Sequence, residues 1–114
     1  MDSKDVSVLK KILQHTENIQ IYCRSCGSLK EFESDSMRVE ATVFNLMQIG
    51  ELAKQLLSDA AKQQITTIPW QQIYGLRNRI VHGYSGVNMQ IVWDTVKYDI
   101  PDLAMELRNV VYQK

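Results

Sequence analysis

The chain has 114 residues, a length typical of one domain, and its 13 Lys and Arg residues balance 13 Asp and Glu residues. A protein that binds nucleic acid through bulk charge would be strongly basic, so the composition excludes that class. Hydrophobic residues make up 45% and charged residues 23% of the chain, which is typical of a globular protein and argues against disorder.

The first half of the chain predicts two long helices. Apolar residues recur at three- and four-residue steps, which indicates helices and not strands. The first helix is expected over about 5–26, with Ser3 or Asp5 as its N-cap. After a polar connection, the second helix is expected over about 35–57. Gly50 lies in its apolar stripe and costs up to about 1 kcal/mol relative to Ala, which a close approach of another helix would justify.

The second half predicts a short helix and two more long helices. The short helix is expected over about 59–64, and the third long helix over about 69–82, starting at a proline. The fourth is expected over about 88–112, kinked at Pro101 because proline removes one backbone N–H bond. Four amphipathic helices with short connections predict an all-α antiparallel bundle, one domain over 1–114.

The chain termini and the cysteines predict neither export nor a metal site. No apolar run near the N-terminus forms a secretory signal, and no stretch reaches the roughly 18 apolar residues of a membrane span. We therefore expect a cytoplasmic protein with no membrane contact. Cys23 and Cys26 lack a second pair at zinc-ligand spacing, so we expect them to bind no metal and to have no redox role.

Charge is unevenly distributed along the chain despite the zero total. No acidic residue lies between Asp59 and Asp94, and Lys62, Arg77 and Arg79 give this stretch a formal charge of +3. The stretch contains no carboxylate to neutralise them. We therefore expect a local, salt-sensitive positive surface that could attract a phosphate backbone.

Segment 77–84 concentrates the side chains that phosphodiester chemistry needs, namely Arg77, Asn78, Arg79, His82 and Tyr84. Metal-free RNA cleavage uses the 2′-hydroxyl as nucleophile, and needs a base, a proton donor and a cation for the phosphate. Histidine, with a reference pKa of about 6.5, serves as acid or base, and arginine donors match a phosphate. One Arg and one His as the candidate catalytic residues of this segment are a small set, which a symmetric dimer facing two such segments would double.

The same residues also have structural interpretations, which spacing alone leaves open. Asn78 and His82 share a helix face, whereas Arg77 and His82 lie roughly 140° apart around the axis. An Arg and a His near a helix C-terminus often just complement the helix dipole. Tyr84 would then be a core residue with its hydroxyl at the edge, and Arg79 a solvated residue that adds positive potential.

With its surroundings, this segment resembles the Arg-x4-His-x-Tyr motif of the HepT-like HEPN toxins. Residues 48–54 are similar to the Ile-Gly-Glu-Ala helix segment of that family, and 68–73 to its Pro-x-Trp lead-in, here shortened to Pro-Trp. Residues 92–93 and 100–103 are similar to its last helix. The resemblance covers about 37–110.

The resemblance implies a dimeric helical bundle that acts as a metal-independent endoribonuclease without a cofactor, its two Arg/His motifs facing one cleft. It implies the toxin half of a toxin–antitoxin pair. The antitoxin would be a minimal nucleotidyltransferase that transfers AMP from ATP to the motif tyrosine. By position, Arg77 and His82 would be the catalytic pair, Asn78 a supporting residue and Tyr84 the modified residue. Arg79 is assigned to RNA binding.

Inhibition by AMP needs no change of fold. Tyr84 is two residues from His82, so an attached AMP would occupy the place of an RNA phosphate and pair with Arg77. Glu51, beside Gly50, is expected either to orient His82 or Arg77, or to be a solvated acid or a structural ion pair.

Two other functions remain open from the sequence. The chain could be a non-catalytic module that binds nucleotide, RNA or protein, with the Arg and His gripping a phosphate. It could also be a structural subunit that caps a nucleotidyltransferase through its basic rim.

Overall fold

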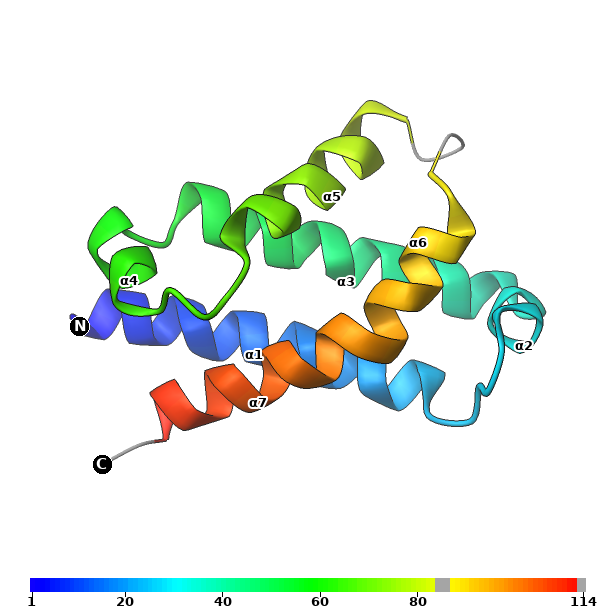
Figure 1. The fold of residues 1–114 in the computed structure, drawn as a ribbon, viewed down its shortest axis with the longest axis horizontal. Coiled ribbons are helices and arrows are strands. Elements are labelled where there is room, and N and C mark those ends of the chain that lie inside the picture. The colour runs from blue at the N-terminus through cyan, green and yellow to red at the C-terminus, as the bar shows by residue number, and fades with distance from the viewer. Residues whose placement is uncertain (84–86, 113–114) are drawn as a thin grey trace.

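The computed structural model describes residues 1–83 and 87–112, in which all regular structure is helical (Figure 1). The elements in chain order are α1 (Ser3–Cys23), α2 (Leu29–Glu33), α3 (Ser36–Gln55), α4 (Asp59–Gln64), α5 (Trp70–His82), α6 (Met89–Asp94), the π-helical segment η2 (Thr95–Asp99) and α7 (Ile100–Val111). The predicted all-α class is confirmed. Tyr84, the residue expected to be modified, lies outside the described residues.

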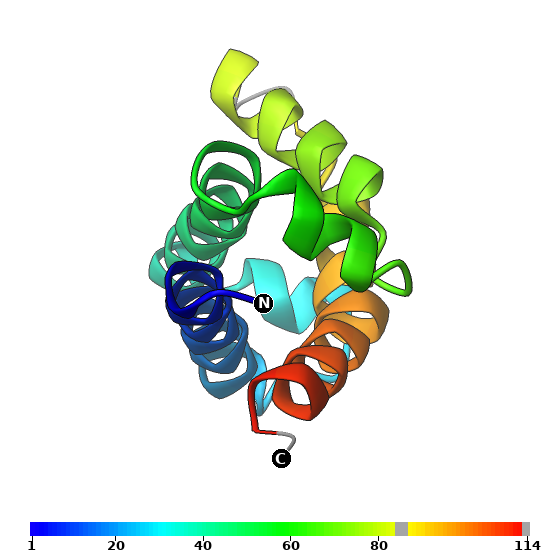
Figure 2. The ribbon, with the colours of Figure 1, turned by 90° about the vertical axis from the view of Figure 1, so that its left-hand side faces the viewer.

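The long helices form a bundle in which α1 is the central neighbour. It packs against α3 on one side and α7 on the other, and α5 packs on α3. Viewed end-on, α5 lies along the top of the bundle, above α3 and away from α1 (Figure 2). The short helix α2 contacts both α3 and α6 and closes one end. This arrangement leaves much of α5 uncovered by the rest of the chain.

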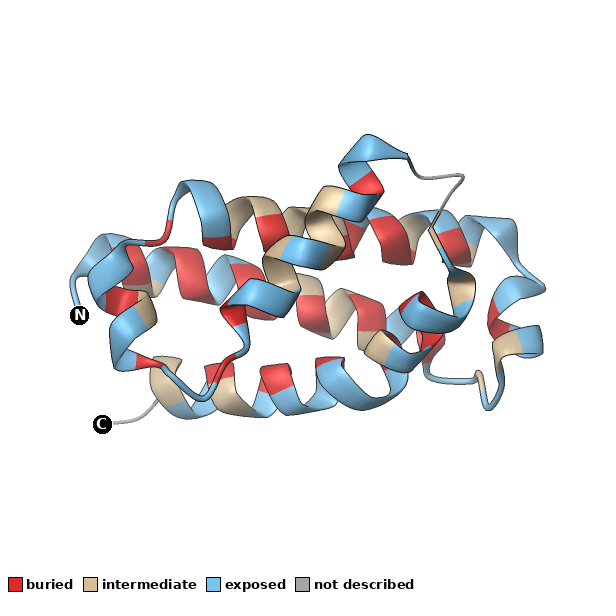
Figure 3. Cartoon of the chain, turned by 45° about the horizontal axis from the view of Figure 1, so that its top comes forward, coloured by how far each residue is buried: buried red, intermediate tan, exposed pale blue. Residues whose placement is uncertain are grey.

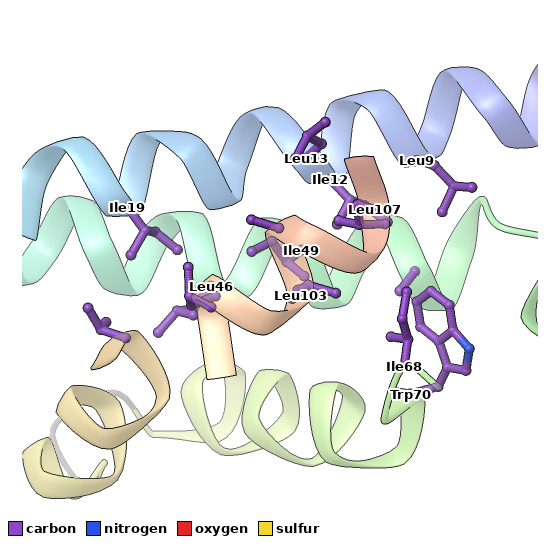
Figure 4. Packing of buried hydrophobic residues seen from close by; sticks show 14 of the residues in the cluster. Leu9, Ile12, Leu13, Ile19, Leu46, Ile49, Ile68, Trp70, Leu103 and Leu107 are labelled. Atoms are coloured by element: carbon purple, nitrogen blue, oxygen red, sulfur yellow. The ribbon is translucent and has the colours of Figure 1, made fainter. Parts of the chain in front are cut away.

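The core runs between the inward faces of these helices (Figure 3). Leu9, Ile12 and Ile19 of α1 and Leu107 of α7 are fully buried in this core (Figure 4). Burying each such side chain contributes about 1.5–3 kcal/mol. None of the helices in 1–83 and 87–112 combines the length and the apolar character needed to cross a membrane.

The start of α1 differs from the sequence prediction. Asp2, and neither Ser3 nor Asp5, caps the helix: its carboxylate accepts from the Asp5 backbone N–H at 2.8 Å. The Asp5 carboxylate instead accepts from the backbone N–H and the hydroxyl of Ser58, at 3.0 and 2.7 Å. These two bonds lower the pKa of Asp5 below its ordinary value. Asp5 therefore ties α1 to the start of α4. The other end of α1 is at Cys23, not near 26.

The predicted interruption at Pro101 is confirmed as a change of helix type. Proline has no N–H for the carbonyl of Lys97, and its ring crowds that carbonyl. The preceding turn widens into η2, where Ile100 donates to the carbonyl of Thr95, five residues back. The chain turns between α6 and α7 at this point (Figure 1).

Candidate functional site

Helix α5 carries the polar segment, and its start is fixed by Trp70. Trp70 is buried, and its indole N–H donates to the backbone carbonyl of Ile65 at 3.1 Å. The side chain points from the start of α5 into the core (Figure 4). The helix then continues to His82, and the Gly83 N–H closes its last turn on the Arg79 carbonyl at 3.2 Å. The predicted third helix is confirmed, and the candidate residues occupy its C-terminal half.

Gly50 marks the point where α3 and α5 come closest. A Cβ added at Gly50 would lie 2.3 Å from Cβ and 2.7 Å from Cγ of Arg77, so no side chain fits there. The predicted close helix approach at Gly50 is confirmed, and α5 is the helix that approaches. The stem of Arg77 therefore lies directly on the backbone of α3.

The guanidinium of Arg77 is held on two sides. Its Nε donates to the Glu51 carboxylate, and its Nη1 donates to Oδ1 of Asn78 at 2.9 Å. The side chains of Arg77 and Glu51 are 17% and 34% exposed, so the pair lies at the edge of the protein. The stretch between Asp59 and Asp94 has no carboxylate of its own, but Glu51 reaches Arg77 from α3, so the expected contact of Glu51 is confirmed for Arg77 and not for His82 among the described residues. Asn78 also has a defined contact, since it binds the guanidinium.

His82 and Arg79 are two exposed residues of α5. Both side chains are exposed, and His82 ends the helix. No hydrogen bond joins His82 to Arg77, Asn78 or Glu51 in the part of the chain that the structure describes. The structure thus brings together Arg77, Asn78 and Glu51, and places His82 at the free end of the same helix.

A groove lies along the side of α5 that faces the η2–α7 segment. Its volume is about 920 Å³, and it runs between α5 and the η2–α7 segment. Leu76, Arg79, Asp99 and Leu103 are among its lining residues, whereas Arg77, Asn78 and His82 are not. Burial, together with the nearby charges of Asp102 and Asp94, raises the pKa of the Asp99 carboxyl. The candidate catalytic residues therefore do not line this groove.

The cysteines lie apart from this segment. Cys23 and Cys26 are free thiols, and Cys23 is buried beside the hydroxyl of Thr42, with 3.5 Å between sulfur and oxygen. Burial raises the pKa of Cys23, which disfavours the reactive thiolate. Within residues 1–83 and 87–112, no group of three or more His, Cys, Asp or Glu side chains is placed to hold a metal ion.

Comparison with known proteins identifies relatives over most of the chain. Residues 12–110 match the family described as Ribonuclease HepT-like. A protein of Thermococcus cleftensis named "Probable ribonuclease HepT" is 33% identical over 95 residues, covering 83% of this chain and 84% of the relative. Proteins named "Putative RNase" from Caldanaerobacter subterraneus (31% identical, 76% of this chain and 77% of the relative) and Methanocaldococcus jannaschii (29%, 97% and 91%) are similar too. No solved structure matches significantly.

Proposed function

This chain belongs to the HepT-like ribonuclease family, and from that premise we propose that it is a metal-independent endoribonuclease and the toxin of a toxin–antitoxin pair. The observation that carries the proposal is the arrangement on α5. A guanidinium anchored by Glu51 and Asn78 lies about 1.4 helical turns from an exposed imidazole at the helix end. An anchored cation and an accessible acid–base group are two of the three groups that cleavage through the 2′-hydroxyl requires, the third being an acid for the leaving oxygen.

The reaction follows from these two groups. His82 removes the proton of the 2′-hydroxyl, and the oxygen attacks the adjacent phosphorus. The bond to the 5′-oxygen breaks, and this leaving oxygen takes a proton from an acid. The products are a 2′,3′-cyclic phosphate and a 5′-hydroxyl. Arg77 holds the phosphate oxygens as negative charge builds on them, and Arg79 attracts the RNA backbone.

A homodimer would complete the site. The reaction needs a base on one side of the phosphorus and an acid on the other, and one chain supplies one histidine in this segment. Arg77 and His82 also diverge by roughly 140° around α5, so one copy does not surround a phosphate. Two copies that face each other along α5 would place two arginines and two histidines around one RNA strand.

Regulation would act on the same place. We propose that a minimal nucleotidyltransferase antitoxin transfers AMP from ATP to the hydroxyl of Tyr84 and releases pyrophosphate. The phosphodiester on Tyr84, two residues after His82, would take the position of the RNA phosphate at Arg77.

The ribonuclease activity is tested with protein produced without an antitoxin. We expect it to cut RNA in EDTA and to leave 2′,3′-cyclic phosphate ends, identified by mass spectrometry of the fragments. The double variant Arg77→Ala/His82→Ala, purified identically, controls for contaminating ribonucleases. RNA or nucleotide binding with no cleavage at any pH from about 5 to 9, the range in which histidine titrates, would instead favour the non-catalytic binding module.

The antitoxin mechanism is tested by intact mass. Co-expression with a minimal nucleotidyltransferase is expected to add whole AMP units to the chain, mapped to Tyr84 by peptide analysis. The Tyr84→Phe variant keeps the ring and removes the acceptor hydroxyl, so it should retain the unmodified mass. An unmodified wild-type chain under these conditions would count against the mechanism.

A further inference from the structure

We infer that Glu51 is the positioning residue for Arg77, and that Gly50 and Glu51 together form a cradle that aims the guanidinium at the scissile phosphate. The inference rests on the proposed ribonuclease function and adds a role to that site. Glu51 does not itself touch the RNA in this arrangement. It acts through Arg77.

The floor of the cradle is the backbone at Gly50. With no Cβ there, Cβ and Cγ of Arg77 settle against α3 at distances that any other residue would forbid. An arginine on an open helix surface would sample many rotamers, and each of them would place the charge differently. Contact with the α3 backbone removes most of this freedom before RNA arrives.

The side of the cradle is the Glu51 carboxylate. It accepts from Nε, the donor nearest the stem, while Asn78 accepts from Nη1. These two bonds fix the rotation of the guanidinium plane from opposite edges. The Nη2 donors have no hydrogen-bond partner among the described residues, and a phosphate oxygen matches them in charge and geometry.

The charge of Glu51 has a second consequence. It offsets the charge of Arg77, so the site attracts RNA less strongly than a bare arginine would. Losing the carboxylate should therefore leave RNA affinity equal or higher, because one more positive charge faces the backbone. Turnover should fall, because a guanidinium that is no longer fixed meets the transition state less often. A lower kcat without a rise in KM therefore distinguishes positioning from general structural support, whose loss would weaken RNA binding as well.

The kinetic test compares substitutions at two glutamates on one face of α3. Glu51→Ala is expected to lower kcat about 100-fold with KM unchanged or lower. Glu51→Gln keeps an acceptor for Nε, so its kcat should lie between those of the wild type and Glu51→Ala. Glu40→Ala is the matched control: Glu40 is exposed and lies eleven residues, or about three turns, earlier on the same face. Unchanged kcat in Glu51→Ala, or a kcat loss with a matching rise in KM and a lower melting temperature, would overturn the inference.

A second test of the contact between Glu51 and Arg77 uses NMR spectroscopy and does not depend on ribonuclease activity. In ¹H–¹⁵N spectra, the Nε–H of Arg77 should give a shifted, exchange-protected signal, assigned by its absence in Arg77→Lys. The signal should lose its shift and protection in Glu51→Ala and keep both in Glu40→Ala. A wild-type chain that cuts no RNA would refute the proposed function. The cradle would then be supported by the altered signal and refuted if the signal were the same in Glu51→Ala.

Discussion

The His82→Ala variant is expected to lower the rate of RNA cleavage by about 10²- to 10⁴-fold, the usual contribution of a general acid or base. His82 is exposed at the last position of α5, and its side chain is not part of the hydrophobic core. Alanine is the best helix former, so the substitution should leave the helix intact. RNA affinity should change little, because Arg77 and Arg79 remain. The loss is therefore expected in turnover.

The measurement is single-turnover cleavage of a labelled RNA in EDTA, with thermal unfolding of each variant. The control is the other histidine of the chain, His15, which is half-buried in α1 with its Nδ1 2.7 Å from Oδ1 of Asn45. His15→Ala should lower the melting temperature and leave the cleavage rate near that of the wild type. Wild-type turnover in His82→Ala would remove His82 from the mechanism, whatever its effect on stability.

Local signals in the sequence were sufficient to predict most of α3 to α7. Ser58 caps α4 and Asn88 caps α6 through side-chain bonds to backbone N–H groups within three residues, so the caps can be recognised without knowing the fold. Pro69 marks the start of α5 in another way: it caps the helix without a side-chain hydrogen bond, at a helix end where the missing N–H of proline is not needed. The position of the π-helical segment follows from Pro101, because a proline that has helical residues before it disrupts the turn that precedes it.

The start of α1 could not be settled in this way. Asp2 and Asp5 are both suitable caps, and they lie within one turn of each other. The choice depends on Ser58, 53 residues beyond Asp5, which takes up the second carboxylate through two hydrogen bonds. A cap is a local feature, but competition between two caps is decided by the tertiary fold.

In the candidate site, too, local features could be predicted from the sequence and contacts between distant residues could not. The spacing of Arg77 and His82 is visible in the sequence, and so is a glycine in the apolar stripe of α3. The partner of Glu51 is not visible, because Arg77 lies 26 residues further along the chain and meets Glu51 only where α5 packs on α3. The sequence therefore left Glu51 between a solvated acid, an ion pair and an orienting residue. Gly50 was the usable clue, since it indicated where another helix would cross α3.

The second large effect is expected at that crossing, where Gly50→Ala should destabilise the fold and reduce cleavage together. On an open helix, Gly→Ala stabilises by about 1 kcal/mol. Here the new Cβ would lie 2.3 Å from Cβ of Arg77, an atom that the α5 backbone holds in place. No change of rotamer relieves this contact, so α3 and α5 must separate. Overpacking of this kind costs about 1–3 kcal/mol, which exceeds the gain in helix propensity.

Gly75→Ala provides the matched comparison. Gly75 lies in α5, and a Cβ added there would meet nothing within 4 Å, so only the propensity gain should remain. Chemical denaturation should therefore show shifts of opposite sign, with Gly75→Ala more stable than the wild type and Gly50→Ala less stable. Cleavage by Gly50→Ala should fall by about 100-fold, because a displacement of roughly 1 Å moves the guanidinium off the phosphate. If the two alanine variants were equally stable and equally active, Arg77 would not pack closely on α3 in solution. The inference that Gly50 helps to position Arg77 for the phosphate would then be refuted as well.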